Sequence, residues 1–374
     1  MWILLIILIP LMGLAYVGWH VWMLLPLAAM WKGAVIAVGV ICFLLLPLDL
    51  SGTLERLPLP LARLLYEIGT SSILVLLYLF MVFLLLDVGR FINIVPRTWL
   101  YANGVTVAAL SGILITVFLF GNIHYNNKVR VTLDLRTAKP LKQDYTIVMA
   151  SDLHLGYHNT RRDLTHWIDL LNAEHPDFVL IAGDIIDISV HPLLVEDMAT
   201  EFRRIQAPVY ACLGNHEYYS NEPQARAFYE AAGIHLLRDS CAVVKDLCII
   251  GRDDRTNPHR TALPQLLLQA DTSKYCILLD HQPYHLEQTE RAGIDFQLSG
   301  HTHEGQIWPI SWITHLMYEC AWGSHQRGNT QYYVSSGLGI WGGKFRIGTQ
   351  SEYIVMRLCA GQTDNKTGRT KCTP

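Results

Sequence analysis

Charged residues are scarce in this sequence: Asp, Glu, Lys and Arg make up 16% of its 374 residues, against about 25% in a typical soluble domain. The shortage falls on residues 1–121, which hold only 9 of the 61 charged side chains. The remaining 253 residues hold 52, a proportion near the soluble average. This distribution excludes a single soluble domain, a disordered chain and a collagen-like or coiled-coil rod.

A dense basic stripe is also lacking. The net charge is −3 and the pI is near 6.6, so no surface is set up to neutralise the phosphates of a nucleic acid. We therefore expect no nucleic-acid partner. The eight cysteines form neither a CxxC pair nor a metal-binding pattern. Three of them, Cys212, Cys248 and Cys276, lie inside predicted strands, as small core residues do, and this slightly favours a reducing compartment.

The charge-poor region contains four long apolar runs, at residues 2–25, 33–48, 71–86 and 100–120. Each is close to the roughly 20 residues that a helix needs to cross the hydrocarbon of a bilayer. A cleaved signal peptide does not fit the first run, because no basic residue precedes it and further runs follow. Charged residues are almost absent inside the runs, which favours an anchor over an ion pathway. Residues 1–121 are therefore predicted to be a transmembrane helical anchor of about four helices.

Lysine and arginine near the span ends predict the orientation in the cell membrane. With four spans, the N-terminus, the loop at residues 49–70 between the second and third runs, and the C-terminal part share one side. That side carries seven basic residues, namely Arg56, Arg63, Lys128, Arg130, Arg136, Lys139 and Lys142. The other side carries three, namely Lys32, Arg90 and Arg97. The excess predicts a multi-pass membrane protein whose C-terminal domain is cytoplasmic.

The second part of the chain reads as an α/β domain at residues 145–359. A connector and edge strand are expected at 122–144, and a disordered tail at 360–374. Short apolar runs typical of buried strands, at 145–150, 178–182, 208–213, 275–279 and 295–298, alternate with helical patterns at 160–174, 192–205, 223–232, 263–270 and 286–292. Two further strands are expected between 241 and 250. This alternation predicts packed layers of sheet and helix.

Five of the predicted strands end directly in a polar motif. Ligands of α/β sheets bind beyond the carboxyl ends of strands, so we expect these five loops to converge. Taken singly, each motif is more typical of an ordinary turn or helix cap. Together they supply Asp, Asn and His, which suit divalent transition metals. The motifs are Asp152-x-His154, Gly183-Asp184-x-x-Asp187, Gly214-Asn215-His216-Glu217, a lone His281, and Gly300-His301-x-His303.

In their composition and order, these motifs resemble the calcineurin-like metallophosphoesterase superfamily. The stretch 346–353 is similar to the end of membrane-associated bacterial members, which include phosphodiesterases and UDP-diacylglucosamine pyrophosphatases. The resemblance covers residues 145–357 and implies a four-layer β-sandwich flanked by helices. It identifies the superfamily with high specificity and the substrate with little.

The resemblance also implies a binuclear metal centre. One ion would bind Asp152, His154 and His303, and the other would bind Asn215, His281 and His301. Asp184 would bridge the two ions, which are expected to be Mn²⁺, Fe or Zn²⁺. A hydroxide shared by the ions would attack the phosphorus. His216 would protonate the leaving group, with Asp187 orienting its ring.

The function implied is metal-dependent hydrolysis of a phosphodiester or pyrophosphate, with a lipid substrate suggested by the anchor. Two alternatives stay open: a tethered phosphodiesterase for soluble substrates, and a non-catalytic or regulatory binding module on a membrane protein. Residues 307–317 read equally as a packed loop or as an apolar lip for an acyl chain or the bilayer. His158, Arg161 and Arg162 read equally as phosphate contacts or as a solvated helix start. Glu304 either places a carboxylate beside the metals, which would disfavour a highly anionic substrate, or points to solvent; the second is expected.

Overall fold

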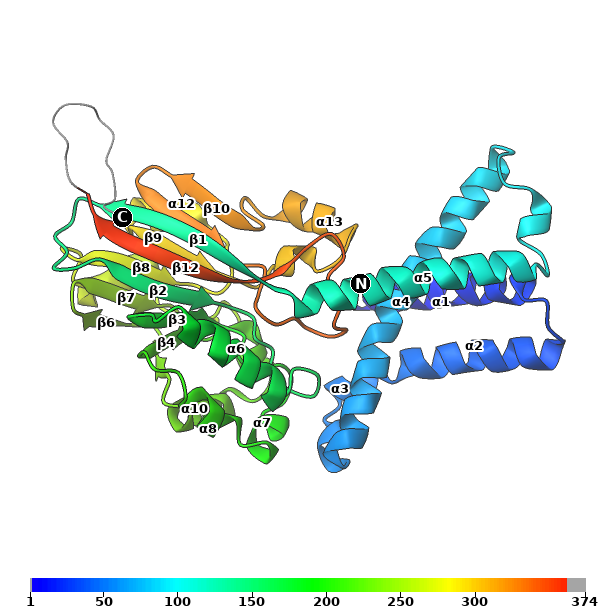
Figure 1. Ribbon diagram of the computed structural model, residues 1–374, viewed down its shortest axis with the longest axis horizontal. Helices are drawn as coiled ribbons and strands as arrows, with labels where there is room; N and C mark the ends of the chain where they lie inside the picture. Colours follow the sequence, from blue (N-terminus) through cyan, green and yellow to red (C-terminus); the bar gives the residue numbers. More distant parts are fainter. Residues whose placement is uncertain (1, 362–374) are drawn as a thin grey trace. The chain divides into compact units, whose positions relative to one another are not determined.

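The computed structural model describes residues 2–361 of the chain, shown in Figure 1. It contains two compact units. The first comprises residues 1–123 together with Gly342–Lys344, and the second comprises His124–Trp341 and residues from Phe345 onward. The predicted tail falls almost wholly on residues 362–374, which lie outside the described part, while Ala360 is the last residue of a strand.

The first unit is entirely helical, as predicted. Its long helices are α1 (Trp2–Leu24), α2 (Ala29–Leu44), α4 (Leu59–Phe91) and α5 (Gly104–Asn126), joined by α3 (Leu46–Leu50), η1 (Thr53–Arg56) and η2 (Arg97–Trp99). Three segments are long and apolar enough to cross a membrane, namely Ala29–Leu48, Leu59–Phe91 and Gly104–Asn126, and Leu8–Leu24 is a shorter apolar helix. Within this unit, Val17 and Leu24 of α1 pack against Phe83 of α4.

Two expectations about this region were wrong. The inter-span loop was expected to reach residue 70, but α4 begins at Leu59, where Pro60 occupies a first-turn position that suits a residue without a backbone N–H. The polar residues 122–127 were expected to form a connector. Instead α5 continues to Asn126, and β1 (Lys128–Thr137) starts two residues later. Polarity alone does not end the helix, because residues 122–126 contain no Gly or Pro to stop it.

The second unit contains two mixed six-stranded sheets (Figure 1). The first has the order β1-β12-β2-β3-β4-β5, and the second has the order β10-β11-β9-β8-β7-β6. Their remaining strands are β2 (Tyr145–Ala150), β3 (Phe178–Ala182), β4 (Val209–Cys212), β5 (His235–Leu236), β6 (Ser240–Val244), β7 (Leu247–Gly251), β8 (Tyr275–Leu279), β9 (Phe296–Ser299), β10 (Gly323–Arg327), β11 (Thr330–Val334) and β12 (Ser351–Ala360).

Side-chain alternation along the strands produces the layers. In β2, Ile147 and Met149 face the second sheet, whereas Val148 and Ala150 face the helices outside. In β8, Ile277 joins the same central core, while Cys276 and Leu278 face outward. The result is a sandwich of two sheets with helices on both outer faces, which confirms the predicted fold class.

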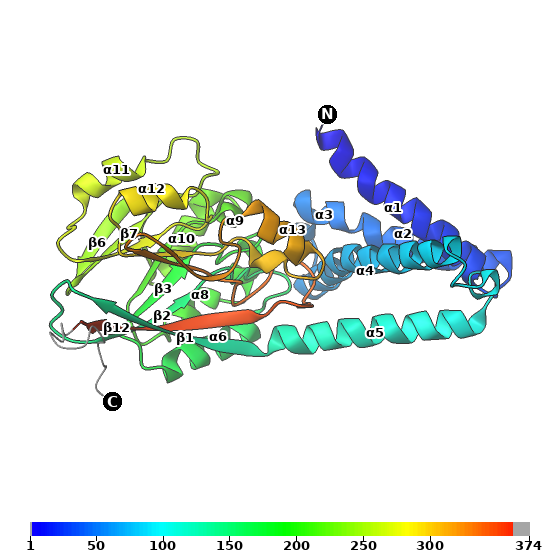
Figure 2. The same cartoon turned by 90° about the horizontal axis from the view of Figure 1, so that it is seen from above.

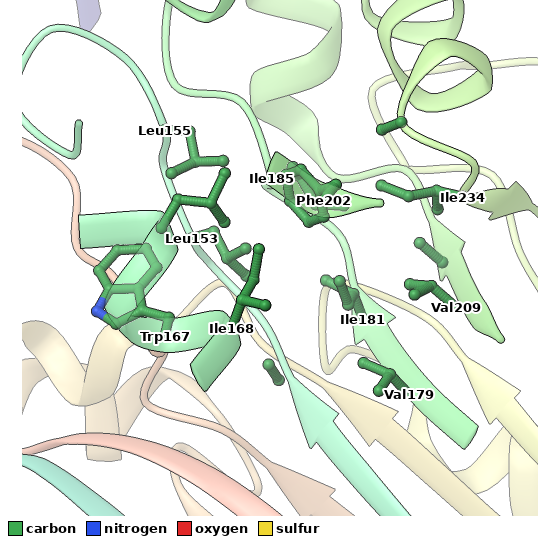
Figure 3. Packing of buried hydrophobic residues seen from close by; sticks show 14 of the residues in the cluster. Leu153, Leu155, Trp167, Ile168, Val179, Ile181, Ile185, Phe202, Val209 and Ile234 are labelled. Carbon is green, nitrogen blue, oxygen red and sulfur yellow. The ribbon is translucent and has the colours of Figure 1, made fainter. Parts of the chain in front are cut away.

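Helices cover each outer face of the sandwich. On the first sheet, Trp167 and Ile168 of α6 (Arg161–Ala173) and Phe202 of α8 (Met198–Phe202) pack over Val179 and Ile181 of β3 (Figure 3). On the second sheet, α11 (Leu263–Leu266) packs over β7 and β8. Figure 2 shows α11 and α12 (Leu286–Arg291) on the side of the domain away from α6.

The remaining helices are α7 (His191–Val195), α9 (Asn215–Tyr219), α10 (Glu222–Ala231), η3 (Leu267–Gln269), η4 (His303–Gly305) and α13 (Ile310–Met317). The predicted helix at 192–205 is in fact two short ones, α7 and α8, because Asp197 between them has a left-handed backbone with φ of 48°. The strands β5, β10, β11 and β12 were not predicted.

Candidate metal centre

All seven predicted metal ligands lie at the carboxyl ends of strands, as expected. The loops after β2, β3 and β4 carry Asp152, His154, Asp184 and Asn215, and the loops after β8 and β9 carry His281, His301 and His303. The fold brings these residues together from both sheets. Six of the seven, all except Asn215, belong to groups of possible ligand atoms, and the group of His154, Asp184 and His216 overlaps the two others. In each group the atoms lie within 4.8 Å of one another.

One group consists of Asp152, His154 and His303. The Nε2 atoms of the two imidazoles are 3.0 Å apart. The Asp152 Oδ1 atom lies 3.9 Å from Nε2 of His154 and 3.5 Å from Nε2 of His303. Asp152 and His154 are fully buried. Two imidazole nitrogens and a carboxylate oxygen that face a common point can hold one cation.

A second group consists of Asp184, His281 and His301. Asp184 Oδ2 lies 3.1 Å from Nε2 of His281, and 3.6 Å from Nε2 of His154 in the first group. Asn215 Oδ1 lies 2.9 Å from Nδ1 of His301 and 3.2 Å from Nε2 of His281. Asp184 therefore lies between the two groups, where a bridging carboxylate would have to be.

A backbone carbonyl fixes the orientation of His281. Its Nδ1 lies 2.7 Å from the carbonyl oxygen of Ala182, so this nitrogen donates a proton to that oxygen and Nε2 is the nitrogen that faces Asp184. Such a partner holds the tautomer that a metal ligand requires. His303 Nδ1, by contrast, is buried with no hydrogen-bond partner.

Asp187 orients more than the one histidine that the motif predicted. Its Oδ1 lies 3.4 Å from Nδ1 of His216 and 3.2 Å from Nδ1 of His154, and its Oδ2 lies 3.8 Å from Nδ1 of His158. The backbone carbonyl of Asp187 lies 3.2 Å from the same nitrogen of His216. Asp187 is thus placed both to orient the proposed acid and to fix a ring of the first ligand group.

Strained backbone marks this cluster. Asp152, His154, Asp184, His301 and His303 all have positive φ, between 45° and 71°. Left-handed backbone is unfavourable for residues other than glycine, and it persists where surrounding structure enforces it, typically at functional sites. Five of the seven predicted ligands share this conformation, which a set of ordinary loop residues would not.

Two glycines allow the loops to approach each other this closely. A Cβ atom on Gly214 would collide with the Asp184 carboxylate, and a Cβ on Gly300 would collide with Asp152 and Ser151. Both glycines were quoted in the motifs, and their contacts explain why the motifs contain them.

Electrostatics within the cluster keep acids and bases in defined states. Burial disfavours the charged form of Asp184, but the facing rings of His281 and His216 hold its pKa well below the usual value. Burial also disfavours a charge on His216, yet Asp184 and Asp187 raise the pKa of His216 to about 9. Burial and the neighbouring His281 lower the pKa of His301 to about 4. At neutral pH, His216 is therefore charged and His301 is neutral.

Two residues that support the site had no role assigned from the sequence. The fully buried carboxylate of Glu217 accepts hydrogen bonds from the backbone N–H groups of Gly214 (2.7 Å), Asp184 (3.1 Å) and Ile186 (3.0 Å), which ties two ligand loops together. Arg346, also fully buried, donates from Nη1 to the carbonyl of His303 at 2.6 Å and from Nη2 to the carbonyls of Ser336 and Gly339. Apart from the local bond between Gly214 and Glu217, these contacts join segments far apart in the chain, so the sequence carries no local signal for them.

Other expectations about the rim of the site are corrected. Glu304 is buried rather than solvated, and burial raises its pKa to about 7. Of the two readings of Arg161, its contacts with Glu201 at 3.3 Å and with the carbonyl of Glu196 at 2.9 Å favour the helix start. His158 is buried against Asp187 and the carbonyl of Ile340.

The fold and this cluster define a class: an α/β sandwich with a candidate binuclear metal site at the carboxyl edge of its strands. Residues 145–305 match the family model described as calcineurin-like phosphoesterase. An uncharacterized metallophosphoesterase of Campylobacter jejuni is 32% identical over 67% of this chain and 69% of its own length. The chain belongs to the calcineurin-like metallophosphoesterase family.

Further relatives share the combination of this domain with a membrane region. A transmembrane protein with metallophosphoesterase domain from Danio rerio is 31% identical over 55% of this chain and 51% of its own length. Among solved structures, a dimetal phosphatase from Danio rerio aligns with 52% of this chain and 87% of its own, at 13% identity and a TM-score of 0.36.

Proposed function

We propose that the chain is a membrane-anchored phosphoesterase that hydrolyses a phosphodiester or pyrophosphate with two divalent metal ions, and that residues 145–359 are its catalytic domain. The observation that carries the proposal is the convergence of overlapping donor groups from five strand ends, with Asp184 between them. Membership of the metallophosphoesterase family supports it.

The donor set fits two such ions. Asp152, His154 and His303 would hold one, Asn215, His281 and His301 the other, and Asp184 would be shared. The Nε2 atoms of His154 and His303 face each other 3.0 Å apart, so both rings could donate a lone pair to one cation. When bound, ions in such sites lower the pKa of water and neutralise charge on phosphate oxygens.

His216 would supply the proton to the leaving oxygen. Asp184 and Asp187 favour its charged form, and its ring is partly exposed, with a side-chain accessibility of 13% against 0% for His154. A charged, oriented imidazole with access to solvent is suited to general-acid catalysis. Asp187 would act as a positioning residue through Nδ1 of His216.

The anchor favours a substrate that resides in the bilayer, because tethering raises the local concentration of a lipid phosphate. The seven-to-three excess of basic residues favours a cytoplasmic catalytic domain. A reporter fused after Pro374 tests the side: we expect cytoplasmic activity of the reporter in intact cells. Reporter activity only on the outer side would overturn the assignment.

The function is tested with detergent-purified protein and Mn²⁺ against a phosphomonoester, a soluble phosphodiester, a phosphatidyl lipid and an acylated pyrophosphate. We expect hydrolysis of at least one diester or pyrophosphate, and a loss of several orders of magnitude in Asp184→Asn. Asp169→Asn is the matched control, because Asp169 is an exposed carboxylate on α6 that pairs with Arg204 at 2.7 Å.

The outcomes separate the alternatives. Unchanged turnover in Asp184→Asn would contradict the two-metal proposal. Binding of Mn²⁺ without turnover of any substrate would indicate a binding or regulatory module. Equal rates on soluble and acylated substrates would leave the phosphoesterase in place and overturn the lipid preference.

A further inference from the structure

The short helix α13 (Ile310–Met317) is amphipathic in the wrong sense for a soluble domain. Its buried residues are the polar Ser311 and Thr314. Its apolar residues face outward, with exposed fractions of 63% for Trp312, 88% for Leu316 and 64% for Met317. A helix on a water-soluble domain normally buries its apolar stripe. An exposed contiguous apolar patch marks a contact with a partner or a membrane.

The packing around Gly305 explains why the polar face points inward. A Cβ on Gly305 would lie 2.6 Å from the backbone nitrogen of Ser311 and from Oγ1 of Thr314, so α13 approaches the ligand loop more closely than large side chains would permit. The exposed apolar face is therefore a consequence of a tight docking of this helix beside His303, and its orientation is fixed.

Backbone hydrogen bonds locate α13 at one end of the first sheet. The residues just before α13 are hydrogen-bonded to the residues just before β12. The backbone N–H of Trp308 donates to the carbonyl of Ile347 at 2.7 Å. Four residues later, Ser351 is paired with Lys128, the first residue of β1. The base of α13 thus lies at the end of the sheet where β1 begins.

This end of the sheet is also where the chain leaves for the membrane. One residue separates β1 from α5, whose 23 residues correspond to about 35 Å of helix, slightly more than the roughly 30 Å of hydrocarbon in a bilayer. The last turn of α5 is hydrogen-bonded within the second unit, because the hydroxyl of Tyr125 donates to Oδ1 of Asn159 at 2.6 Å. A membrane-spanning α5 therefore holds this edge of the domain at the bilayer surface.

The composition of the patch agrees with an apolar rather than an electrostatic contact. The segment 303–322 contains no Lys or Arg, so attraction to anionic lipid cannot drive binding. The rings of Trp308 and Trp312 pack edge to face with centroids 5.4 Å apart. Tryptophan is the residue most typical of the membrane–water interface, where one edge of the ring is apolar and the other is hydrated.

We propose that the exposed face of α13, formed by Trp312, Ile313, Leu316 and Met317, inserts into the interfacial layer of the bilayer and docks the domain on the membrane beside the loop that carries His303. The docking requires α5 to span the bilayer and does not depend on which reaction the site catalyses.

The test uses the full chain in nanodiscs of zwitterionic phosphatidylcholine that carry a nitroxide near the head of the acyl chain. A fluorescent label is placed at Leu316→Cys, and the labelling of native cysteines is measured on the unmodified chain and subtracted. Leu268→Cys is the matched control. Leu268 is 85% exposed on the same domain and lies in η3, on the outer side of the second sheet. We expect several-fold stronger quenching at position 316 than at 268.

A third label at Ile115→Cys, in the middle of α5, reports on the anchor itself. It should be quenched by a nitroxide deep in the chain. Failure at 115 would overturn the membrane-spanning assignment, whereas quenching at 115 with equal signals at 316 and 268 would overturn the docking alone.

Two further outcomes would also overturn the proposal. Quenching at 316 that requires added acylated substrate would identify the patch as an acyl-chain site, and energy transfer between labels on separate molecules in place of quenching would identify a second copy of the chain. Adding Trp312→Glu to the labelled Leu316→Cys chain should abolish quenching at 316, and signals from anionic and zwitterionic nanodiscs should agree.

Discussion

At the scale of single residues, the cluster shows that a ligand set also needs a rigid support. Glu217 fixes two ligand loops through their backbone N–H groups, Arg346 holds the carbonyl of His303, and Asp187 contacts three imidazoles. Buried polar groups of this kind hold ligands in place because leaving any of them unpaired costs about 1–3 kcal/mol. The strained backbone of the ligands persists through this support.

Gly300→Ala tests this rigidity without removing any ligand atom. The added methyl group would collide with the carboxylate of Asp152 and displace it. We expect Mn²⁺ affinity, measured by titration calorimetry, to fall roughly 10- to 100-fold, as for losses of outer support at other metal sites. Gly112→Ala is the control, since a Cβ there meets nothing within 4 Å. An unchanged affinity for Gly300→Ala would show that the loop relaxes freely.

At the scale of elements, strands with continuous apolar runs were predicted best. The boundaries of β2, β3 and β8 agree with the expected ones, because a strand buried on both faces reads as an unbroken apolar segment. By contrast β12 was missed: it lies between β1 and β2, with Val131 aligned to Ile354 and Met149 also aligned to Ile354. Its register depends on strands about 200 residues away, so no local pattern reveals it.

Asp253, just after β7, connects several elements. Its environment predicts that the folding stability falls at acid pH. It accepts hydrogen bonds from Tyr218 at 2.6 Å, Asn257 at 2.7 Å and Arg238 at 2.7 Å. Burial raises the pKa of Asp253, but these three partners outweigh it and leave the pKa below its usual value. Because the folded-state pKa is the lower one, this stabilisation is complete above the unfolded pKa of about 4 and is lost as pH falls through the folded value.

The comparison is between the wild-type chain and Asp253→Asn, with Tm measured from pH 6 to pH 3. We expect the variant to have the lower Tm at pH 6 and the shallower decline below pH 4, because it carries no proton-sensitive carboxylate at this position. Asp169→Asn, on the surface of α6, should reproduce the wild-type profile. Parallel profiles for Asp253→Asn and wild type would contradict the assignment.

At the scale of the whole molecule, the two units have compositions suited to different solvents. The first is apolar helix with candidate membrane spans, and the second is a sandwich with its own central core and all the candidate ligands. The candidate ligands come from five separate strand ends, so cation binding should be coupled to the integrity of the second unit.

Binding of a metal ion should therefore stabilise the second unit against unfolding. A cation that binds only the folded state at 100 times its Kd adds about 2.7 kcal/mol to the free energy of unfolding. We expect Mn²⁺ to raise the Tm of the chelator-treated protein and to have little effect on His301→Ala with His303→Ala. An equal shift in that double variant would place the bound cation elsewhere.

The sequence alone determined the apolar helices, the buried strands and the candidate ligand residues, because each of these follows from a run or spacing of a few neighbouring residues. Only the tertiary structure decided that Asp187 contacts three histidines and that Arg346 and Glu217 hydrogen-bond to the loops of the cluster. It also decided that β12 lies inside the first sheet and that α13 turns its apolar face outward. These features depend on contacts between segments far apart in the chain, and local composition carries no signal for the partner that each side chain meets.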